Sequence, residues 1–220
     1  FKSFSDQTCK EFRIYVGDDN SPDDIYSIVE KWKDKINIEY TRFDHNIGAS
    51  NLVAQWNRCF DLVKDESWIW LFSDDDFVDS NCVSSFYSSL ISNPLFDIFH
   101  FDTVIVDEHG DRFRKASQYP RIISGSDYLD LTFRWKDRTN GISFIVRREK
   151  FYSHGCFQYF DLAWGSDNAT WLKLSNPNGI YTIPGAYTYW RYGGGSISST
   201  WSKNIARRKK EAFLDSLEWR

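Results

Sequence analysis

An apolar run that ends at three aspartates is the feature that most constrains the fold of this chain. Residues 68–72 read Trp-Ile-Trp-Leu-Phe, and after Ser73 come Asp74, Asp75 and Asp76. A short continuous run of aromatic and branched apolar residues predicts a strand that is buried on both faces. In a parallel α/β sheet, ligands bind beyond the carboxyl ends of the strands. The sequence therefore predicts an α/β fold with three carboxylates at its ligand-binding edge.

Three adjacent carboxylates repel one another and raise one another's pKa values unless a positive charge lies among them. Mg2+ and Mn2+ prefer oxygen ligands, and Mg2+ is typically held by one or two carboxylates together with substrate phosphates. Asp74, Asp75 and Asp76 are therefore candidates for a metal site. The alternative is a solvated acidic loop that caps the following helix, and the triplet alone does not decide between the two.

Composition narrows the class of protein. The chain has 220 residues, 41% of them hydrophobic, which is enough for the core of one α/β domain. A net charge of −4 argues against a dedicated nucleic-acid-binding protein. The four cysteines show neither Cys-x-x-Cys nor zinc-finger spacing, so we expect reduced thiols in a cytoplasmic protein. No stretch approaches the ~20 apolar residues of a membrane span.

Strand and helix patterns alternate along the chain, without an internal repeat or a linker, and this predicts one domain. Ser21 and Pro22 predict the N-cap and first position of the first long helix, and Gly48 predicts a turn with positive φ. Expected strands cover 11–16, 36–42, 68–72, 96–107, 141–147, 180–183 and 187–192. Expected helices lie near 1–8, 22–32, 52–63, 82–93, 124–133, 148–154 and 201–220.

Five segments, in this order, resemble the GT-A glycosyltransferases, specifically the large inverting family 2. Gln7-Thr8 with 12–24 is similar to that family's "QT…EIIVVDDGSTD" opening, and 44–48 is similar to its N-x-G turn. Residues 73–76 resemble its DXD segment, 141–148 resemble the strand before its acceptor loop, and 165–167 lie where the family carries an acidic pair ending in the catalytic Asp. The resemblance covers Gln7 to about Ser199.

The resemblance implies a GT-A, Rossmann-like single domain over 1–220 with a mostly parallel central sheet flanked by helices. Residues 1–105 would bind the nucleotide sugar, 106–200 would bind the acceptor, and 201–220 would form a terminal helix. The family's sheet also has a central strand ahead of the Gln7 segment. We therefore expect roughly 20–40 residues before Phe1 in the natural protein, enough for one strand and most of a helix.

The implied reaction is inverting transfer of a sugar, of the hexosyl type, from a nucleotide-diphosphate donor. The donor is expected to be a UDP-sugar, and the acceptor a hydroxyl of a glycan or lipid-linked molecule in bacterial surface polysaccharide synthesis. Asp19 resembles the residue that accepts the uracil N–H, and Asp74 would lie near the ribose. Asp75, supported by Asp76, would bind Mn2+ or Mg2+, although bare D-x-D spacing would select Asp74 and Asp76 instead.

Asp167 would be the general base, because inverting transfer needs a carboxylate that takes the proton of the acceptor hydroxyl. The residue before Asp167 is Ser166, where the family usually has Glu. Asp161 is therefore a rival candidate for the general base, and the alternative role for Asp167 is that of a helix N-cap. Arg191 would reach the diphosphate from a loop hinged at the glycines 193–195, or it is an ordinary surface arginine. Trp164 and Trp190 are candidates for stacking on sugars, with core packing as the favoured alternative.

Two other classes of protein stay open at this point. One is a sugar nucleotidyltransferase on a similar fold, and the other is a non-catalytic carbohydrate-binding domain on a degenerate transferase fold. The basic run 207–210 in the terminal helix is either a solvated face or a peripheral contact with an anionic membrane surface at the inner face of the plasma membrane.

Overall fold

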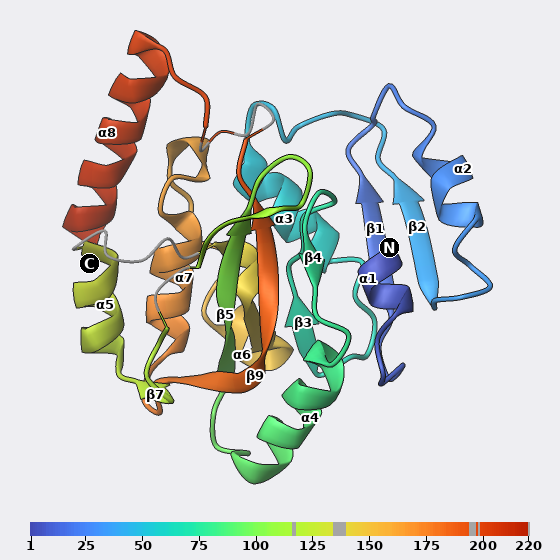
Figure 1. The fold of residues 1–220 in the computed structure, drawn as a ribbon. Coiled ribbons are helices and arrows are strands. Elements are labelled where there is room, and N and C mark those ends of the chain that lie inside the picture. The colour runs from blue at the N-terminus through green and yellow to red at the C-terminus, as the bar shows by residue number, and fades with distance from the viewer. Residues whose placement is uncertain (116–117, 134–139, 194–196, 198, 220) are drawn as a thin grey trace.

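The computed structural model describes residues 1–220 apart from 116–117, 134–139, 194–196, 198 and 220. Figure 1 shows a mixed α/β architecture in which helices lie on both sides of a central sheet. The helices are α1 (Lys2–Ser5), α2 (Ile25–Glu30), α3 (Leu52–Phe60), α4 (Cys82–Ser92), α5 (Gly125–Phe133), α6 (Arg148–Ser153), α7 (Ser166–Leu174) and α8 (Lys203–Trp219), with short 3-10 turns η1 (Gly141–Ser143) and η2 (Asp161–Ala163).

The strands form two sheets. They are β1 (Ile14–Asp18), β2 (Ile38–Arg42), β3 (Trp68–Trp70), β4 (Phe77–Val78), β5 (Ile98–Val106), β6 (Arg112–Lys115), β7 (Ile122–Ile123), β8 (Phe144–Arg147) and β9 (Ile180–Arg191). β1 and β2 pair in parallel with each other, and the other strands form a seven-stranded sheet with the central order β3-β8-β5-β9-β4.

The expected α/β fold is confirmed, but the larger sheet is mixed rather than mostly parallel. Among its described strands, β5 and β9 pair in parallel, whereas every other pairing is antiparallel. The reason is that β8 runs in the reverse direction between β3 and β5, and the short strands β4, β6 and β7 add antiparallel neighbours. The two expected strands at 180–183 and 187–192 are one strand, β9, whose pairing with β5 shifts register between Ile183 and Tyr187.

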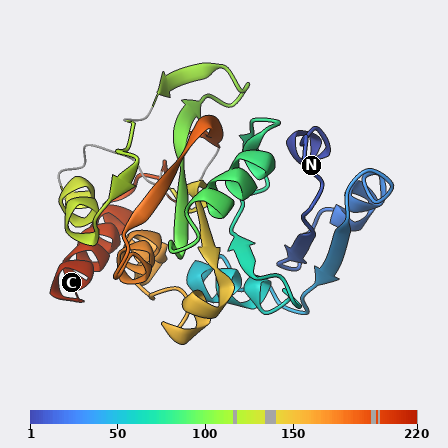
Figure 2. The ribbon, with the colours of Figure 1, turned by 90° about the horizontal axis from the view of Figure 1, so that it is seen from below.

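β1 and β3 face each other across the gap between the two sheets. Within the described part of the chain, β1 pairs only with β2, and β3 pairs only with β8. A pocket separates them, lined by Ile14 and Val16 from one side and by Trp68 and Trp70 from the other. Figure 2 shows β1, β2 and α2 set to one side of the larger sheet. The expectation of a strand ahead of Phe1 stays a prediction.

Aromatic side chains fill the core on both faces of β5. Phe99 and Phe101 are fully buried on this strand. On the neighbouring elements, Phe144 and Trp171 stack with their ring centroids 5.0 Å apart. Burial of such rings supplies a large share of the stability of a domain, roughly 2–3 kcal/mol per fully buried side chain. The high aromatic content therefore serves the core, and this rigid core positions the strand ends at the candidate site.

The first acidic turn differs from its sequence prediction in a way that concerns the site. Helix α2 begins at Ile25 and is capped by Asp24, whose side chain accepts from the Ser27 N–H. Ser21 is not the cap, because its own N–H donates to the buried Asp18 carboxylate. The chain between β1 and α2 therefore folds around Asp18 before the helix starts.

Candidate functional site

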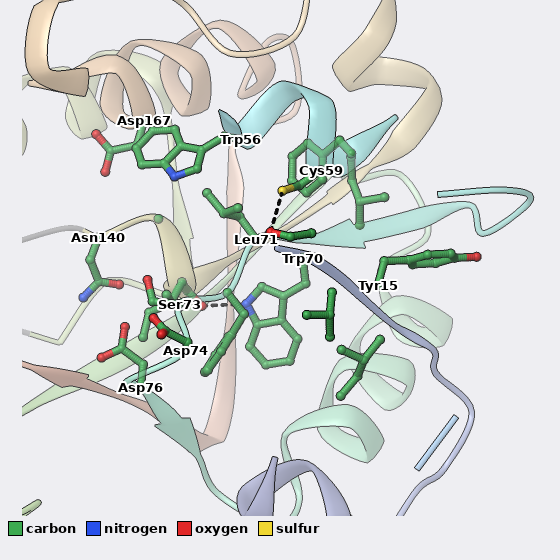
Figure 3. A pocket seen from close by; sticks show the side chains of 18 of the residues that line it. Tyr15, Trp56, Cys59, Trp70, Leu71, Ser73, Asp74, Asp76, Asn140 and Asp167 are labelled. Carbon is green, nitrogen blue, oxygen red and sulfur yellow. Dashed lines mark hydrogen bonds between the residues drawn. The ribbon is translucent and has the colours of Figure 1, made fainter. Parts of the chain in front are cut away.

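All of the residues favoured for catalysis or binding, Asp161 being only a rival candidate, line one continuous pocket of about 1660 Å3. The pocket runs from the gap between the two sheets to the start of α7, so it joins segments that are far apart in the sequence. Figure 3 shows Asp167 on one wall, with Asp74 and Asp76 on another. The predicted residues that line it are Asp19, Asp74, Asp75, Asp76, Asp167 and Arg191.

The acidic triplet forms the turn between β3 and β4. Asp74 and Asp75 are exposed, whereas Asp76 is only 9% exposed. The carboxylate of Asp76 accepts the backbone N–H of Arg191 at 2.7 Å, which fixes it at the end of β9. Burial raises the pKa of Asp76 to about 7, despite the stabilising hydrogen bond. Burial, and then repulsion from Asp74, also raises the pKa of Asp75.

These carboxylates fit a divalent metal that arrives with a phosphate group. Burial and mutual repulsion raise the pKa values of Asp75 and Asp76 although Arg191 acts to lower both, and a bound cation would oppose these shifts. In the described part of the chain, no group of three or more His, Cys, Asp or Glu side chains converges on one point. Metal binding by one or two of these carboxylates together with substrate oxygens stays a prediction.

Arg191 anchors the triplet to the rest of the molecule. Its Nε donates to the Asp75 carbonyl at 2.9 Å, and its Nη1 donates to the carbonyls of Asp107 and Glu108 at 3.1 and 2.7 Å. The guanidinium thus ties the triplet to the turn between β5 and β6. A contact with a diphosphate stays a prediction, and Gly194 and Gly195 of the expected hinge lie outside the described residues.

Asp19 is held by the turn that the sequence analysis singled out. Its carboxylate accepts the N–H groups of Ile47 and Gly48 at 2.9 and 2.8 Å and also pairs with Arg58. A Cβ on Gly48 would come within 2.7 Å of Asp19 Oδ2. Gly48 is therefore needed for close approach, and it does not have the positive φ that we predicted. A carboxylate offers about four lone-pair directions, so Asp19 can accept one more hydrogen bond.

Asp167 lies in the first turn of α7, and Gly165 rather than Asp167 is the N-cap. The loop before it is unusual, because Leu162, Ala163 and Gly165 all have left-handed φ values of 57, 54 and 85°. Non-glycine residues in this region cost about 1–3 kcal/mol each and cluster at functional sites. The Asp167 Oδ1 accepts the Asn168 N–H at 2.8 Å, and the side chain lines the pocket.

Asp161, the rival for the general base, is held by α8. Arg208 donates to both of its carboxylate oxygens, from Nε at 2.7 Å and from Nη2 at 2.6 Å. This bidentate pair holds the pKa of Asp161 below its usual range. Asp161 is not among the residues that line the pocket, so the geometry favours Asp167 as the candidate base.

Two polar residues escaped the sequence analysis: Arg58, which contacts the pocket residue Asp19, and Asn140, which lines the pocket itself. Arg58 on α3 pairs with Asp19, and its guanidinium lies 3.9 Å from the centre of the Phe43 ring. Asn140, just before η1, is 8% exposed and has an amide nitrogen with no hydrogen-bond partner among the described residues. Arg58 could have been suspected, because it is a charged residue on α3, the helix that follows the turn 44–48. No sequence pattern marks Asn140.

The model of the family described as "Glycosyl transferase family 2" matches residues 1–161. The chain belongs to glycosyl transferase family 2. This confirms the family resemblance; the match covers four of the five segments, and 165–167 lies beyond it. No curated protein matches the chain by sequence.

Solved structures show the same fold in glycosyltransferases. TarS of S. aureus (residues 1–349), in complex with UDP-GlcNAc, is 19% identical with a TM-score of 0.71, and the match covers 97% of this chain and 61% of that one. The mannosyltransferase PcManGT from Pyrobaculum calidifontis, in complex with GDP-Man and Mn2+, is 11% identical with a TM-score of 0.63 and coverages of 98% and 57%. GalNAc-T7 with UDP, GalNAc and Mn2+ is 14% identical with a TM-score of 0.62 and coverages of 94% and 44%. The chain therefore spans between 44% and 61% of the length of these proteins.

The basic run in α8 is partly engaged within the molecule. Arg208 pairs with Asp161, and the Nζ of Lys209 donates to the Thr200 carbonyl at 3.2 Å and lies 4.6 Å from the centre of the Trp164 ring. None of the described helices is both long enough and apolar enough to cross a membrane. Contact of α8 with a membrane surface stays a prediction.

Proposed function

We propose that this domain is an inverting, metal-dependent glycosyltransferase that moves a sugar from a UDP-sugar to a hydroxyl of a glycan or lipid-linked acceptor. The observation that carries the proposal is the pocket itself. It gathers Asp19, the acidic triplet and Asp167 from three distant segments, in a chain of glycosyl transferase family 2. A role in bacterial surface polysaccharide synthesis stays an expectation from the resemblance.

In this mechanism, Asp19 accepts the N–H of the nucleobase and Asp74 lies near the ribose. Asp75 and Asp76 would hold the metal, which when bound would supply positive charge beside the diphosphate leaving group. Asp167 takes the proton of the acceptor hydroxyl. As that proton leaves, the acceptor oxygen forms a bond to the anomeric carbon, and the bond from this carbon to the diphosphate oxygen breaks on the opposite face. The configuration at the anomeric carbon is thereby inverted.

Calorimetric titration of UDP, with and without Mn2+, tests the donor site. We expect binding that needs Mn2+ in the wild type and is lost in Asp75→Ala. Asp34→Ala, which removes an exposed carboxylate outside the pocket, is the matched control and should bind like the wild type. Comparison of Asp74→Ala with Asp75→Ala distinguishes the two registers of the triplet, because Asp76 is a metal ligand in both. Metal-independent binding would contradict the metal site, and stronger binding of GDP than of UDP would contradict the uridine donor.

The Asp167→Asn variant tests the base separately. This change keeps the shape of the side chain but removes its capacity to take a proton, so we expect sugar transfer to fall by about 10^2–10^4-fold. Binding of UDP should stay unchanged, because Asp167 does not contact the nucleotide in this mechanism. Loss of transfer in an Asp161→Asn variant, with Asp167→Asn fully active, would reverse the assignment. Binding of UDP-sugar without any transfer in the wild type would favour a carbohydrate-binding domain.

A further inference from the structure

Asn140 carries a buried hydrogen-bond donor for which the described part of the chain provides no acceptor. The residue is 8% exposed and lines the pocket, and its Nδ2 has no partner. Buried polar atoms are nearly always hydrogen-bonded, so each exception calls for an explanation. Leaving such a donor unpaired costs free energy of about 1–3 kcal/mol. A ligand group that accepts from this amide would recover that cost on binding.

A network of buried hydroxyls fixes the other end of the same amide. The Ser143 hydroxyl donates to Asn140 Oδ1 at 2.6 Å and also contacts the hydroxyls of Thr103 and Thr188 at 2.6 and 3.2 Å. All three hydroxyl residues are at most 4% exposed. A separation of 2.6 Å fits O–H···O and is short for N–H···O. The carbonyl oxygen therefore faces the network, and the NH2 group is the end left for the pocket.

The side chain does not serve the local backbone either. Asn is a preferred N-cap residue, and Asn140 occupies the N-cap position of η1, yet its side chain makes no capping hydrogen bond. The neighbouring chain is instead fixed from β3, because Trp70 Nε1 donates to the Ile142 carbonyl at 2.6 Å. The amide is thus held through Ser143 by threonines on β5 and β9, and the backbone of η1 that follows it is held from β3.

The surroundings indicate what the amide would bind. Asn140, Asp74 and Asp76 line the same pocket, and Figure 3 shows all three pointing into it. A diphosphate oxygen only accepts hydrogen bonds, whereas a sugar hydroxyl can accept from an amide and donate to a carboxylate at the same time. We propose that the Asn140 NH2 donates a hydrogen bond to a hydroxyl of the transferred sugar and helps to select the donor. This inference rests on the proposed function, since it assigns one contact within the donor site.

The test compares UDP with UDP-sugars in the presence of Mn2+. The probes are UDP-glucose, UDP-galactose, UDP-GlcNAc and UDP-GalNAc, and the one that the wild type binds best is used for the variants. Asn140→Asp keeps the shape and the oxygen that accepts from Ser143 but removes both N–H donors. We expect its affinity for the UDP-sugar to fall about tenfold, as for the loss of one buried hydrogen bond, while its affinity for UDP changes less than about twofold.

Two further variants keep the test sharp. Asn140→Ala removes the amide without adding a charge, and it should show the same selective loss. Asn93→Asp is the matched control, because this asparagine lies outside the pocket and its amide already donates to the Ser89 carbonyl. Thermal unfolding of each variant verifies that it is folded at the temperature of the titration.

Each outcome bears on the proposal in a different way. Selective loss of UDP-sugar affinity in both Asn140 variants supports it. Equal affinities in wild type and variants, or equal losses for UDP and UDP-sugar, overturn the sugar contact and leave the proposed function standing. A wild type that binds UDP-sugars no better than an unrelated nucleotide overturns the proposed function, and the sugar contact with it.

Discussion

At the scale of single residues, the buried His100 should make the stability of the core depend on pH. It lies on β5 and is 2% exposed, and its ring contacts those of Tyr119 and Phe144 at centroid distances of 4.3 and 4.8 Å. Its Nδ1 has no hydrogen-bond partner in the described part of the chain. Burial lowers the pKa of His100 from 6.5 to about 3, so the imidazole stays neutral in the folded protein well below neutral pH.

This lowered pKa predicts a loss of stability in mild acid. Below pH 6.5 the unfolded chain binds a proton at His100 that the folded chain does not bind, so the free energy of unfolding falls as the pH drops from 6.5 towards 3. The slope from this residue approaches about 1.4 kcal/mol per pH unit. Above pH 6.5 the residue contributes no pH dependence.

Urea unfolding between pH 7.5 and 5 measures this effect. We expect His100→Leu to have a shallower pH dependence than the wild type over this range. His109→Gln, which alters an exposed histidine, is the matched control and should keep the wild-type slope. Parallel curves for wild type and His100→Leu would contradict the prediction.

Residues differ in how far the sequence reveals them. Asp19 and Asp75 each follow a predicted strand, and the family resemblance adds Asp167, so the sequence predicts that all three share one site. Asn140 could not be assigned from the sequence. Its amide is oriented by Ser143, which in turn contacts Thr103 on β5 and Thr188 on β9, 37 and 48 residues away from Asn140 in the chain. Such a feature exists only after the strands have paired.

At the scale of elements, α8 holds the loop that carries the candidate base. The loop contains the left-handed residues Leu162 and Ala163 just before α7, and the bidentate pair of Arg208 with Asp161 fastens it to α8. Bidentate arginine–carboxylate pairs depend on the planar fork of the guanidinium, which lysine lacks. We infer that α8 keeps the strained loop in place and thereby positions Asp167.

Replacement of Arg208 by lysine should therefore loosen this loop. The amides of Ala163 and Trp164 donate to the carbonyls of Phe160 and Asp161, both at 3.0 Å, and their hydrogen exchange reports on loop opening. We expect up to about fivefold faster exchange in Arg208→Lys, the scale of one partly exposed ion pair. Arg207→Lys is the matched control, because the partners that the structure shows for Arg207, Asn204 at 3.4 Å and Glu211 at 4.0 Å, both belong to α8 itself. Unchanged exchange in Arg208→Lys would show that packing alone holds the loop.

Element positions were predictable where local chemistry decides them. Helix α3 starts at its asparagine cap, Asn51, and α5 begins after Ser124, as periodicity and capping preferences indicate. The start of α2 was wrong by several residues, because Asp18 binds the Ser21 N–H. That contact depends on the position of Asp18 at the end of β1, and local sequence preferences carry no information about it.

At the scale of the whole molecule, the direction in which each strand runs could not be predicted from the apolar pattern of the sequence. Apolar periodicity identifies a strand but says nothing about which neighbour it pairs with or in which sense. β8 reads like any buried strand, yet it runs antiparallel to both β3 and β5. The α/β class was therefore predictable from the alternation of elements, whereas the mixed sheet required the structure.

The gap between β1 and β3 has a consequence for handling the protein. A strand edge without a neighbour is a template on which strands of other molecules can pair, and natural proteins often protect such edges with lysine. Here the facing edges are mostly apolar, Ile14 to Val16 on one side and Trp68 to Trp70 on the other, with Arg13 and Tyr15 both contacting Glu66. We expect the 220-residue chain by itself to associate as its concentration rises.

Sedimentation velocity over a concentration series measures this association. Val16→Lys places a charge at the edge of β1 and should reduce it, whereas Leu95→Lys, at an exposed apolar position away from the gap, should not. A single monomeric species at every concentration would show that the edges are shielded. The gap between β1 and β3 is continuous with the candidate ligand pocket. Association through this gap would therefore limit the concentration at which the domain stays monomeric in solution.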